Sequence, residues 1–204
     1  MSSALTGLLP PILSTLTEKY PLMTLFVYPG SSNDLYAKII SGDLHAAVII
    51  EPQFSMPKTC DWVTWRAELL IVLAHRGITE RDPHAILASQ PFIRYDPKQW
   101  GGRLGEDCLQ QNDLTVRDRY EIGRWIPSLC WSTASWACRL CRTGRRPGPK
   151  DLNLRKICLP QPSQERRVGV LWRRGNPRIR LVQALLTEAQ QLDFAAAAVI
   201  RKAG

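Results

Sequence analysis

Few residues of this 204-residue chain have the type and spacing that catalysis needs. None of the three histidines, His45, His75 and His84, sits in a local catalytic or metal-binding pattern with cysteine, aspartate or glutamate. The sequence contains no Walker loop, no G-x-S-x-G and no H-E-x-x-H. We therefore expect a protein that is not an enzyme and that needs neither a metal nor a cofactor.

Cys138 and Cys141 have the spacing of a zinc or redox pair, and Cys130 lies nearby. Structural zinc normally takes four ligands, and this part of the chain holds no histidine and no fourth cysteine. No export signal is recognised at the N-terminus, so we interpret the six cysteines as thiols in a reducing cytoplasm. No apolar run approaches the roughly 20 residues of a membrane span, and no membrane partner is expected.

The net charge of +9 is concentrated in one window. Residues 124–150 contain six basic residues and no acidic one, together with three of the six cysteines and three of the seven tryptophans. An arginine-rich arm of this kind could bind the phosphates of a nucleic acid. It could equally be a solvated loop, since the window ends in glycines and prolines.

Two predicted helices begin with small polar residues. Ser3 and Ala4 precede the first helix, and Gly30, Ser31 and Ser32 precede the second. The free N–H groups at a helix start favour anionic groups, and the carboxyl ends of strands in α/β sheets are where ligands bind. These residues are therefore candidates for binding a small molecule, although the serines could also be plain N-caps.

A third polar turn follows the predicted strand 91–95. It contains Tyr95 and a predicted loop of Trp100, Gly101 and Gly102. These residues could add hydroxyl and N–H donors to the same small-molecule site.

The elements that must position these residues alternate between helix and strand over residues 1–50, which predicts an α/β fold. Asp82 is a candidate N-cap, and Gly42 is a candidate C-cap. The predicted helices are 3–19, 32–41, 83–89, 104–111 and 178–192. The predicted strands are 23–28, 45–50 (of the buried parallel kind), 62–65, 68–75, 91–95, 116–122, 152–159 and 167–173.

Several short motifs occur in a fixed order along the chain. They are Leu8–Pro11 with Tyr20 and Pro21, Pro29–Ser32 with Leu35, Gly42–Ala47, Pro91–Tyr95 with Trp100–Arg103, and Leu171–Arg178. Each is weak alone, but the ordered set resembles the effector-binding domain of LysR-type transcriptional regulators. The resemblance covers residues 2–122 and 151–192.

The resemblance implies two Rossmann-like α/β lobes, similar to a type II periplasmic binding protein. The first lobe would contain residues 1–70 and 158–204, and the second would contain residues 71–157. In the family a small effector, here expected to be an anionic metabolite, sits between the lobes and biases a DNA-bound homo-oligomer. The residues that we carry over as effector contacts are Ser3, Ala4, Gly30, Ser31, Arg94, Tyr95 and Trp100.

Three departures from the family pattern stand out. The helix-turn-helix through which the family binds DNA is absent from this sequence, and so is the first strand, which should precede Ser3. Loss of that strand would leave a gap and an unpaired sheet edge. Residues 124–150 match nothing in the family, where a helix, a glycine turn and a strand are expected. We therefore expect this window to be irregular and the second lobe to be disrupted.

A change of reading frame is our hypothesis for that window. With suitable codons, the same bases read two nucleotides on spell PVDSVAVLVDRELGVSLVPDWAAPWPE, which has the expected helix, turn and strand.

Two other functions remain open from the sequence. One is a basic nucleic-acid-binding protein that uses residues 124–150. The other is a stand-alone solute-binding protein, which the missing export signal disfavours.

Overall fold

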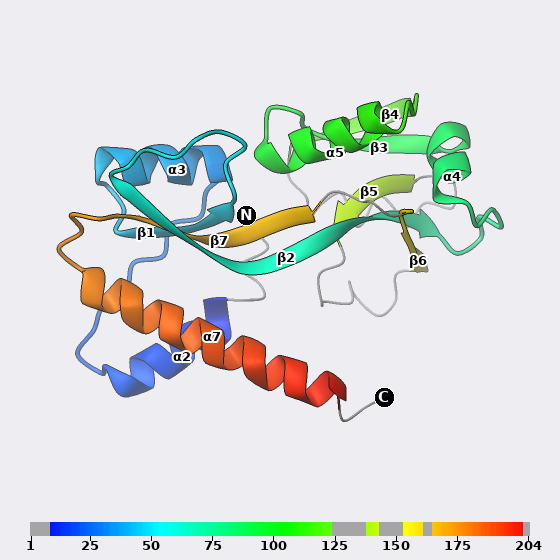
Figure 1. Cartoon of the computed structure of the whole chain (residues 1–204). Helices are drawn as coiled ribbons and strands as arrows, with labels where there is room; N and C mark the ends of the chain where they lie inside the picture. The colour runs from blue at the N-terminus through cyan, green and yellow to red at the C-terminus, as the bar shows by residue number, and fades with distance from the viewer. Residues whose placement is uncertain (1–8, 124–137, 143–152, 161–164, 202–204) are drawn as a thin grey trace. The chain divides into compact units, whose positions relative to one another are not determined.

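The computed structural model describes residues 9–123, 138–142, 153–160 and 165–201 (Figure 1). The chain divides into two compact units, Met1–Arg66 with Val168–Gly204 and Ala67–Arg167. It passes from one unit to the other within β2 (Cys60–His75) and again within β7 (Glu165–Arg173). Both units combine helices with sheet strands, so the predicted α/β class is confirmed.

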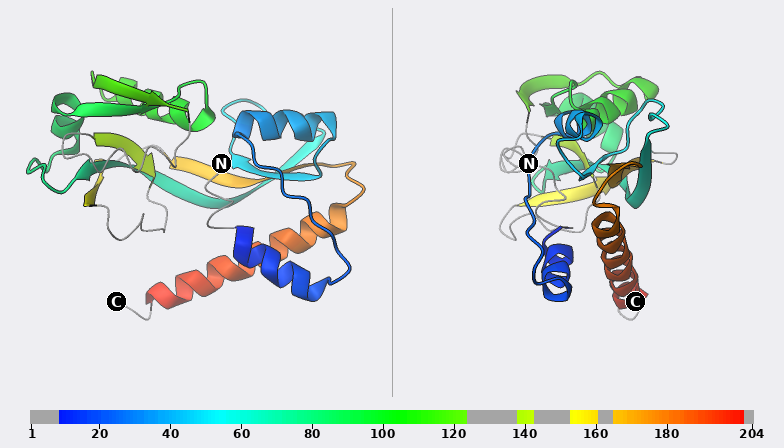
Figure 2. Two further views of the ribbon diagram at one scale, coloured as in Figure 1. Left: turned by 180° about the vertical axis from the view of Figure 1, so that it is seen from behind. Right: turned by 90° about the vertical axis from the view of Figure 1, so that its left-hand side faces the viewer.

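The first unit is built on β1 (Ala46–Ile50) and β7, which pair antiparallel, with Ala46 opposite Trp172. The sequence predicted that β1 is a strand of the parallel kind, and this prediction is wrong for its pairing with β7. Helices α2 (Leu9–Lys19) and α7 (Ile179–Arg201) lie side by side on one face of these strands, and α3 (Ser32–Ser41) covers the other (Figures 1 and 2). An ion pair of 2.6 Å between Lys19 Nζ and Glu188 Oε1 joins α2 to α7.

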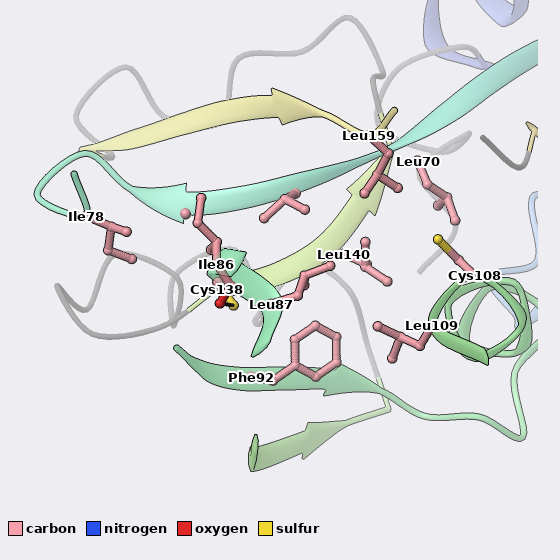
Figure 3. Close-up of a cluster of buried hydrophobic side chains, with 12 residues drawn as sticks. Leu70, Ile78, Ile86, Leu87, Phe92, Cys108, Leu109, Cys138, Leu140 and Leu159 are labelled. Atoms are coloured by element: carbon pink, nitrogen blue, oxygen red, sulfur yellow. Dashed lines mark hydrogen bonds between the residues drawn. The ribbon is translucent and has the colours of Figure 1, made fainter. Parts of the chain in front are cut away.

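The second unit places β5 (Cys138–Arg142) between β2 and β3 (Pro91–Tyr95). Strand β3 pairs parallel with β4 (Arg117–Ile122), and β6 (Leu154–Cys158) pairs antiparallel with β2. Helices α4 (Pro83–Ser89) and α5 (Trp100–Gln111) complete the unit. Side chains from β2, α4, β3, α5 and β5 form its buried core, which includes Leu70, Ile86, Leu87, Phe92, Leu109, Cys138 and Leu140 (Figure 3).

Strand β5 lies inside the window that was expected to be irregular. Cys138 is fully buried, Leu140 is 8% exposed, and the strand pairs antiparallel with β2 from Leu70 to Ala74. Alternation along the strand puts both apolar side chains on the core face, which explains how so basic a stretch can enter the sheet. The expectation of irregular structure is wrong for these five residues. The rest of residues 124–150 lies outside the described residues.

Two other expectations need correction. Strand β2 is one strand of 16 residues, where the sequence indicated two. Residues 23–28, predicted as a strand, form none: no described strand pairs with them, and β propensity alone does not hold a strand. Large apolar side chains are consequently exposed in this stretch and just before it: Leu22, Leu25, Phe26, Val27 and Tyr28.

Candidate functional site

The start of α3 lies at the end of β1. Ser31 is the N-cap, with φ −75° and ψ 163°, and its Oγ accepts a hydrogen bond from the Asp34 amide at 3.2 Å. The Ser32 Oγ accepts from the amide of Ile50, the last residue of β1, at 3.1 Å. The two serines therefore fix the first turn of the helix against the strand end, where the sequence predicted a binding turn.

Gly30 allows this turn to be tight. A Cβ at Gly30 would collide with the Asp34 carboxylate and press within 3.1 Å of the Leu35 side chain. The Asp34 carboxylate itself lies in the first turn, where it interacts favourably with the positive end of the helix dipole. It therefore offsets part of the attraction that this helix start has for an anion.

Arg94 occupies the carboxyl-terminal half of β3. Its Nε and Nη2 donate to the two carboxylate oxygens of Asp118 at 2.8 and 2.9 Å, and its Nη1 donates to Glu106. The side chain is 18% exposed, and the hydrogen bonds to Asp118 are the main cause that raises the pKa of the guanidinium above its ordinary value. Two carboxylates thus neutralise Arg94, which leaves it little net charge to offer an anion.

Tyr95 is the last residue of β3 and lies opposite Ile122 of β4, while Trp100 begins α5. Both side chains are half-buried. The predicted loop of Trp100, Gly101 and Gly102 is wrong, since these residues form the first turn of α5. Gly102 permits the turn to pack on the strand end, because a Cβ there would collide with the carbonyl oxygen of Asp96.

The predicted site residues thus form two local groups. Gly30 and Ser31 lie together in the first unit, and Arg94, Tyr95 and Trp100 lie together at the end of β3 in the second. Ser3 and Ala4 lie outside the described residues.

Asp34, Glu106 and Asp118 are the charged neighbours that the sequence reasoning missed. Asp34 could have been found from its place in the first turn of a capped helix. Glu106 and Asp118 carry no local signal, since they lie 12 and 24 residues from Arg94 and contact it only through tertiary structure.

Two buried cysteines, Cys108 and Cys138, are poorly suited to nucleophilic chemistry. Cys60, Cys108 and Cys138 are buried free thiols, and Cys158 is exposed. Burial raises the pKa of Cys108, and it raises the pKa of Cys138 to about 12. A protonated thiol is neither a good nucleophile nor a metal ligand. Within the described ranges, no three His, Cys, Asp or Glu residues are grouped so that they could hold a metal ion.

Among the helices of the described part of the chain, none is long and apolar enough to cross a membrane.

A family model of the LysR substrate binding domain matches residues 1–193. No curated protein sequence matches the chain.

Solved structures share the fold at low sequence identity. The C-terminal domain of a probable LysR family transcriptional regulator from Rhodococcus sp. RHA1 has a TM-score of 0.76 and 16% identity, over 92% of this chain and 94% of that one. The effector binding domain of QuiR in complex with shikimate has a TM-score of 0.77 and 8% identity, over 93% and 92% of the two chains. The effector binding domain of a BenM variant has a TM-score of 0.77 and 14% identity, over 97% and 93%.

Proposed function

The chain belongs to the LysR substrate-binding domain family, and from this premise we propose that it senses a small anionic metabolite through the start of α3. Binding would bias the arrangement of a homo-oligomer, and DNA would be reached through the helix-turn-helix of the family. The domain would bind its effector without turning it over. Its place of action would be the cytoplasm, where a transcriptional regulator meets DNA.

The arrangement of Ser31 and Ser32 carries the proposal. Each hydroxyl oxygen accepts a backbone N–H, so each hydroxyl hydrogen remains to be donated. Among the described residues, neither hydroxyl hydrogen is donated to an acceptor. Two hydroxyl donors beside the positive end of a helix dipole suit a carboxylate oxygen. Gly30 supports the site, because it keeps side-chain bulk out of the turn.

Arg94, Tyr95 and Trp100 form a second proposed group of contacts in the other unit. Three of the five N–H groups of Arg94 are engaged by Asp118 and Glu106, so two remain without an acceptor among the described residues and could serve a ligand. We assign this group the role of hydrogen-bonding and apolar contact, while the anion charge is met at α3. Ser3 and Ala4 belong to the proposed set through the family resemblance.

The test is calorimetric titration of the chain with shikimate and a panel of other small carboxylates. Shikimate is a suitable first probe because the similar QuiR domain is in complex with it. Loss of one hydrogen bond to a charged group costs about 1.5–3 kcal/mol, so Ser31→Ala should weaken binding roughly tenfold or more. Asp34→Asn should strengthen binding, because it removes a competing negative charge.

Ser41→Ala is the matched control. Ser41 is an exposed serine at the other end of α3, where its hydroxyl contacts Lys38 and Asp43. Its loss should leave the affinity unchanged. Equal affinities for the parent, Ser31→Ala and Ser41→Ala would contradict the assignment of the site to the start of α3. Recovery of a chemically altered ligand would contradict binding without turnover.

A further inference from the structure

Arg155 lies in β6 with part of its guanidinium buried and without a partner. Its Nε and Nη2 are shielded from solvent, and neither atom has a hydrogen-bond partner among the described residues. Burying the donors of a charged group costs free energy when the hydrogen bonds that they made to water are not replaced. Such donors therefore call for an acceptor from outside the protein.

The place of Arg155 in the sheet explains why these atoms are buried. Strand β6 lies beside β2, with Arg155 opposite Ala74 and Ile157 opposite Val72 (Figure 1). Ala74 and Val72 belong to the buried core of the second unit, and Ile157 packs against it. Because side chains alternate along a strand, Arg155 shares the core face with Ile157, whereas Lys156 between them is exposed. The guanidinium is therefore held at the margin of an apolar surface.

Within the described residues, no carboxylate forms an ion pair with Arg155. The two acids that follow β2, Glu80 and Asp82, already accept hydrogen bonds from nearby backbone amides. Residues 124–150, which contribute the neighbouring strand β5, contain no acidic residue at all. The charge of Arg155 is thus left for an external anion to neutralise.

A second cation lies beside the same strand. The Arg76 amide donates to the Asn153 carbonyl oxygen at 2.9 Å, and the Arg76 Nε donates to the Leu154 carbonyl oxygen at 3.2 Å. The Leu154 carbonyl belongs to the peptide group that joins Leu154 to Arg155. Two arginines therefore meet at this end of β6, and their positive potential favours an anion.

The two unpartnered atoms indicate the shape of that anion. Nε and Nη2 form one side of the planar guanidinium fork, which matches the two oxygens of a carboxylate. Arg94 shows this geometry in the same unit, because its Nε and Nη2 donate to the two carboxylate oxygens of Asp118 at 2.8 and 2.9 Å. A carboxylate carries a single charge, so it costs less than a phosphate dianion to bring out of water beside an apolar surface.

We propose that Arg155 binds a small carboxylate side-on at the β6 edge of the second unit. The ligand accepts hydrogen bonds from Nε and Nη2, and its apolar part lies against the core face of β6 and β2. Its binding stabilises the second unit, because it pairs a charge that is otherwise buried alone. The site is separate from the start of α3, so the proposal goes beyond effector binding there and does not depend on it.

The test is a titration of the whole chain with acetate, followed by heteronuclear NMR of the arginine Nε–H groups. The Arg155 resonance is identified by its absence from Arg155→Lys. Acetate should shift this resonance in a saturable way. Acetamide has nearly the same shape without the charge and should leave the resonance in place, as should sodium chloride at the same ionic strength.

Urea unfolding gives a second measurement. Acetate should raise the urea midpoint of the parent above that in sodium chloride. Arg155→Lys keeps the charge but loses the fork, so the dissociation constant for acetate should rise by about tenfold. Arg155→Met should abolish the effect of acetate, and without acetate it should be at least as stable as the parent. Arg103→Met is the matched control, because Arg103 is exposed on α5 and its loss should leave the acetate effect intact.

Ser31→Ala separates this site from the start of α3, because it should leave the shift of the Arg155 resonance unchanged. Three outcomes would overturn the proposal. The Arg155 resonance could fail to respond to acetate, or respond equally to acetamide. Acetate could stabilise Arg155→Met as much as the parent. Inorganic phosphate could shift the resonance where acetate does not, which would exclude a carboxylate. Circular dichroism establishes that each variant is folded, and if Arg155→Met is not, the parent and Arg155→Lys decide the question.

Discussion

Leu140→Ala measures whether β5 belongs to the core of the second unit. The Leu140 side chain is 8% exposed and packs with side chains from β2, α4, β3 and α5 (Figure 3). Leucine-to-alanine substitutions at buried positions cost about 2.7–5.0 kcal/mol, with the larger values where the surroundings cannot collapse into the cavity. Leu140 lies on a strand between two others, which limits collapse, although it is not fully buried. We expect a loss of about 3 kcal/mol in the free energy of unfolding.

Urea unfolding followed by circular dichroism is the assay. At about 1–3 kcal/mol per molar urea, the expected loss moves the midpoint by about 1 M or more. Leu22→Ala is the matched control, since Leu22 is 99% exposed and its truncation should change stability by less than about 0.5 kcal/mol. If Leu140→Ala and Leu22→Ala shift the midpoint equally, β5 does not pack in the core, and the reasoning about the 124–150 window fails.

Three further predictions follow from the same unit. Burial raises the pKa of the Cys138 thiol from the ordinary 9.0 to about 12. The buried neutral thiol therefore contributes its full stability below pH 9, and this contribution is lost as the pH rises from 9 toward 12. Over that range the parent should lose stability more steeply than Cys138→Val, by up to about 1.4 kcal/mol per pH unit. Arg94→Met leaves the carboxylates of Asp118 and Glu106 without their partner, so it should lower the free energy of unfolding by about 2 kcal/mol. Arg103→Met is the control, because Arg103 is exposed on α5 and its loss should cost less than about 0.5 kcal/mol. Urea unfolding measures both. Replacing residues 124–150 with the sequence of the alternative reading frame should raise the urea midpoint, and a lower midpoint would count against the frame hypothesis.

The sequence predicted best those elements whose ends carry local signals. Ser31 and Gly42 cap α3 as expected, and Asp82 caps α4 by accepting from the amides of His84 and Ala85. Caps act within one helical turn, so their chemistry can be read from neighbouring residues. The same locality explains why the start of α3 was identified as a candidate site.

Elements that depend on distant partners could not be predicted in the same way. The sequence predicted two strands, 62–65 and 68–75, yet residues 66 and 67 lie within a continuous β2. Glu68 is only 2% exposed in this strand and takes part in an interaction of its own. A buried acid is tolerated in a strand only when tertiary structure supplies a partner. Residues 23–28 show the opposite case, because strand-forming side chains that have no neighbouring strand in the described part of the chain stay exposed.

The alternative reading frame can be compared with the present sequence at β5, which lies inside residues 124–150. In the alternative reading frame, the residues that align with Cys138–Arg142 are V-S-L-V-P, so Val and Leu stand at the two positions that are buried here. Both sequences therefore place an apolar side chain at 138 and leucine at 140, and both can occupy the gap between β2 and β3. Cysteine behaves as a small hydrophobe when buried, which allows the present sequence to keep the strand. The two frames differ in charge around those positions, since the present one places Arg139 and Arg142 in the strand and the alternative places neither. If residues 124–150 are replaced with the alternative sequence, the frame hypothesis predicts that stability and net charge change while β5 is retained. A simple loss of the second unit would not retain β5.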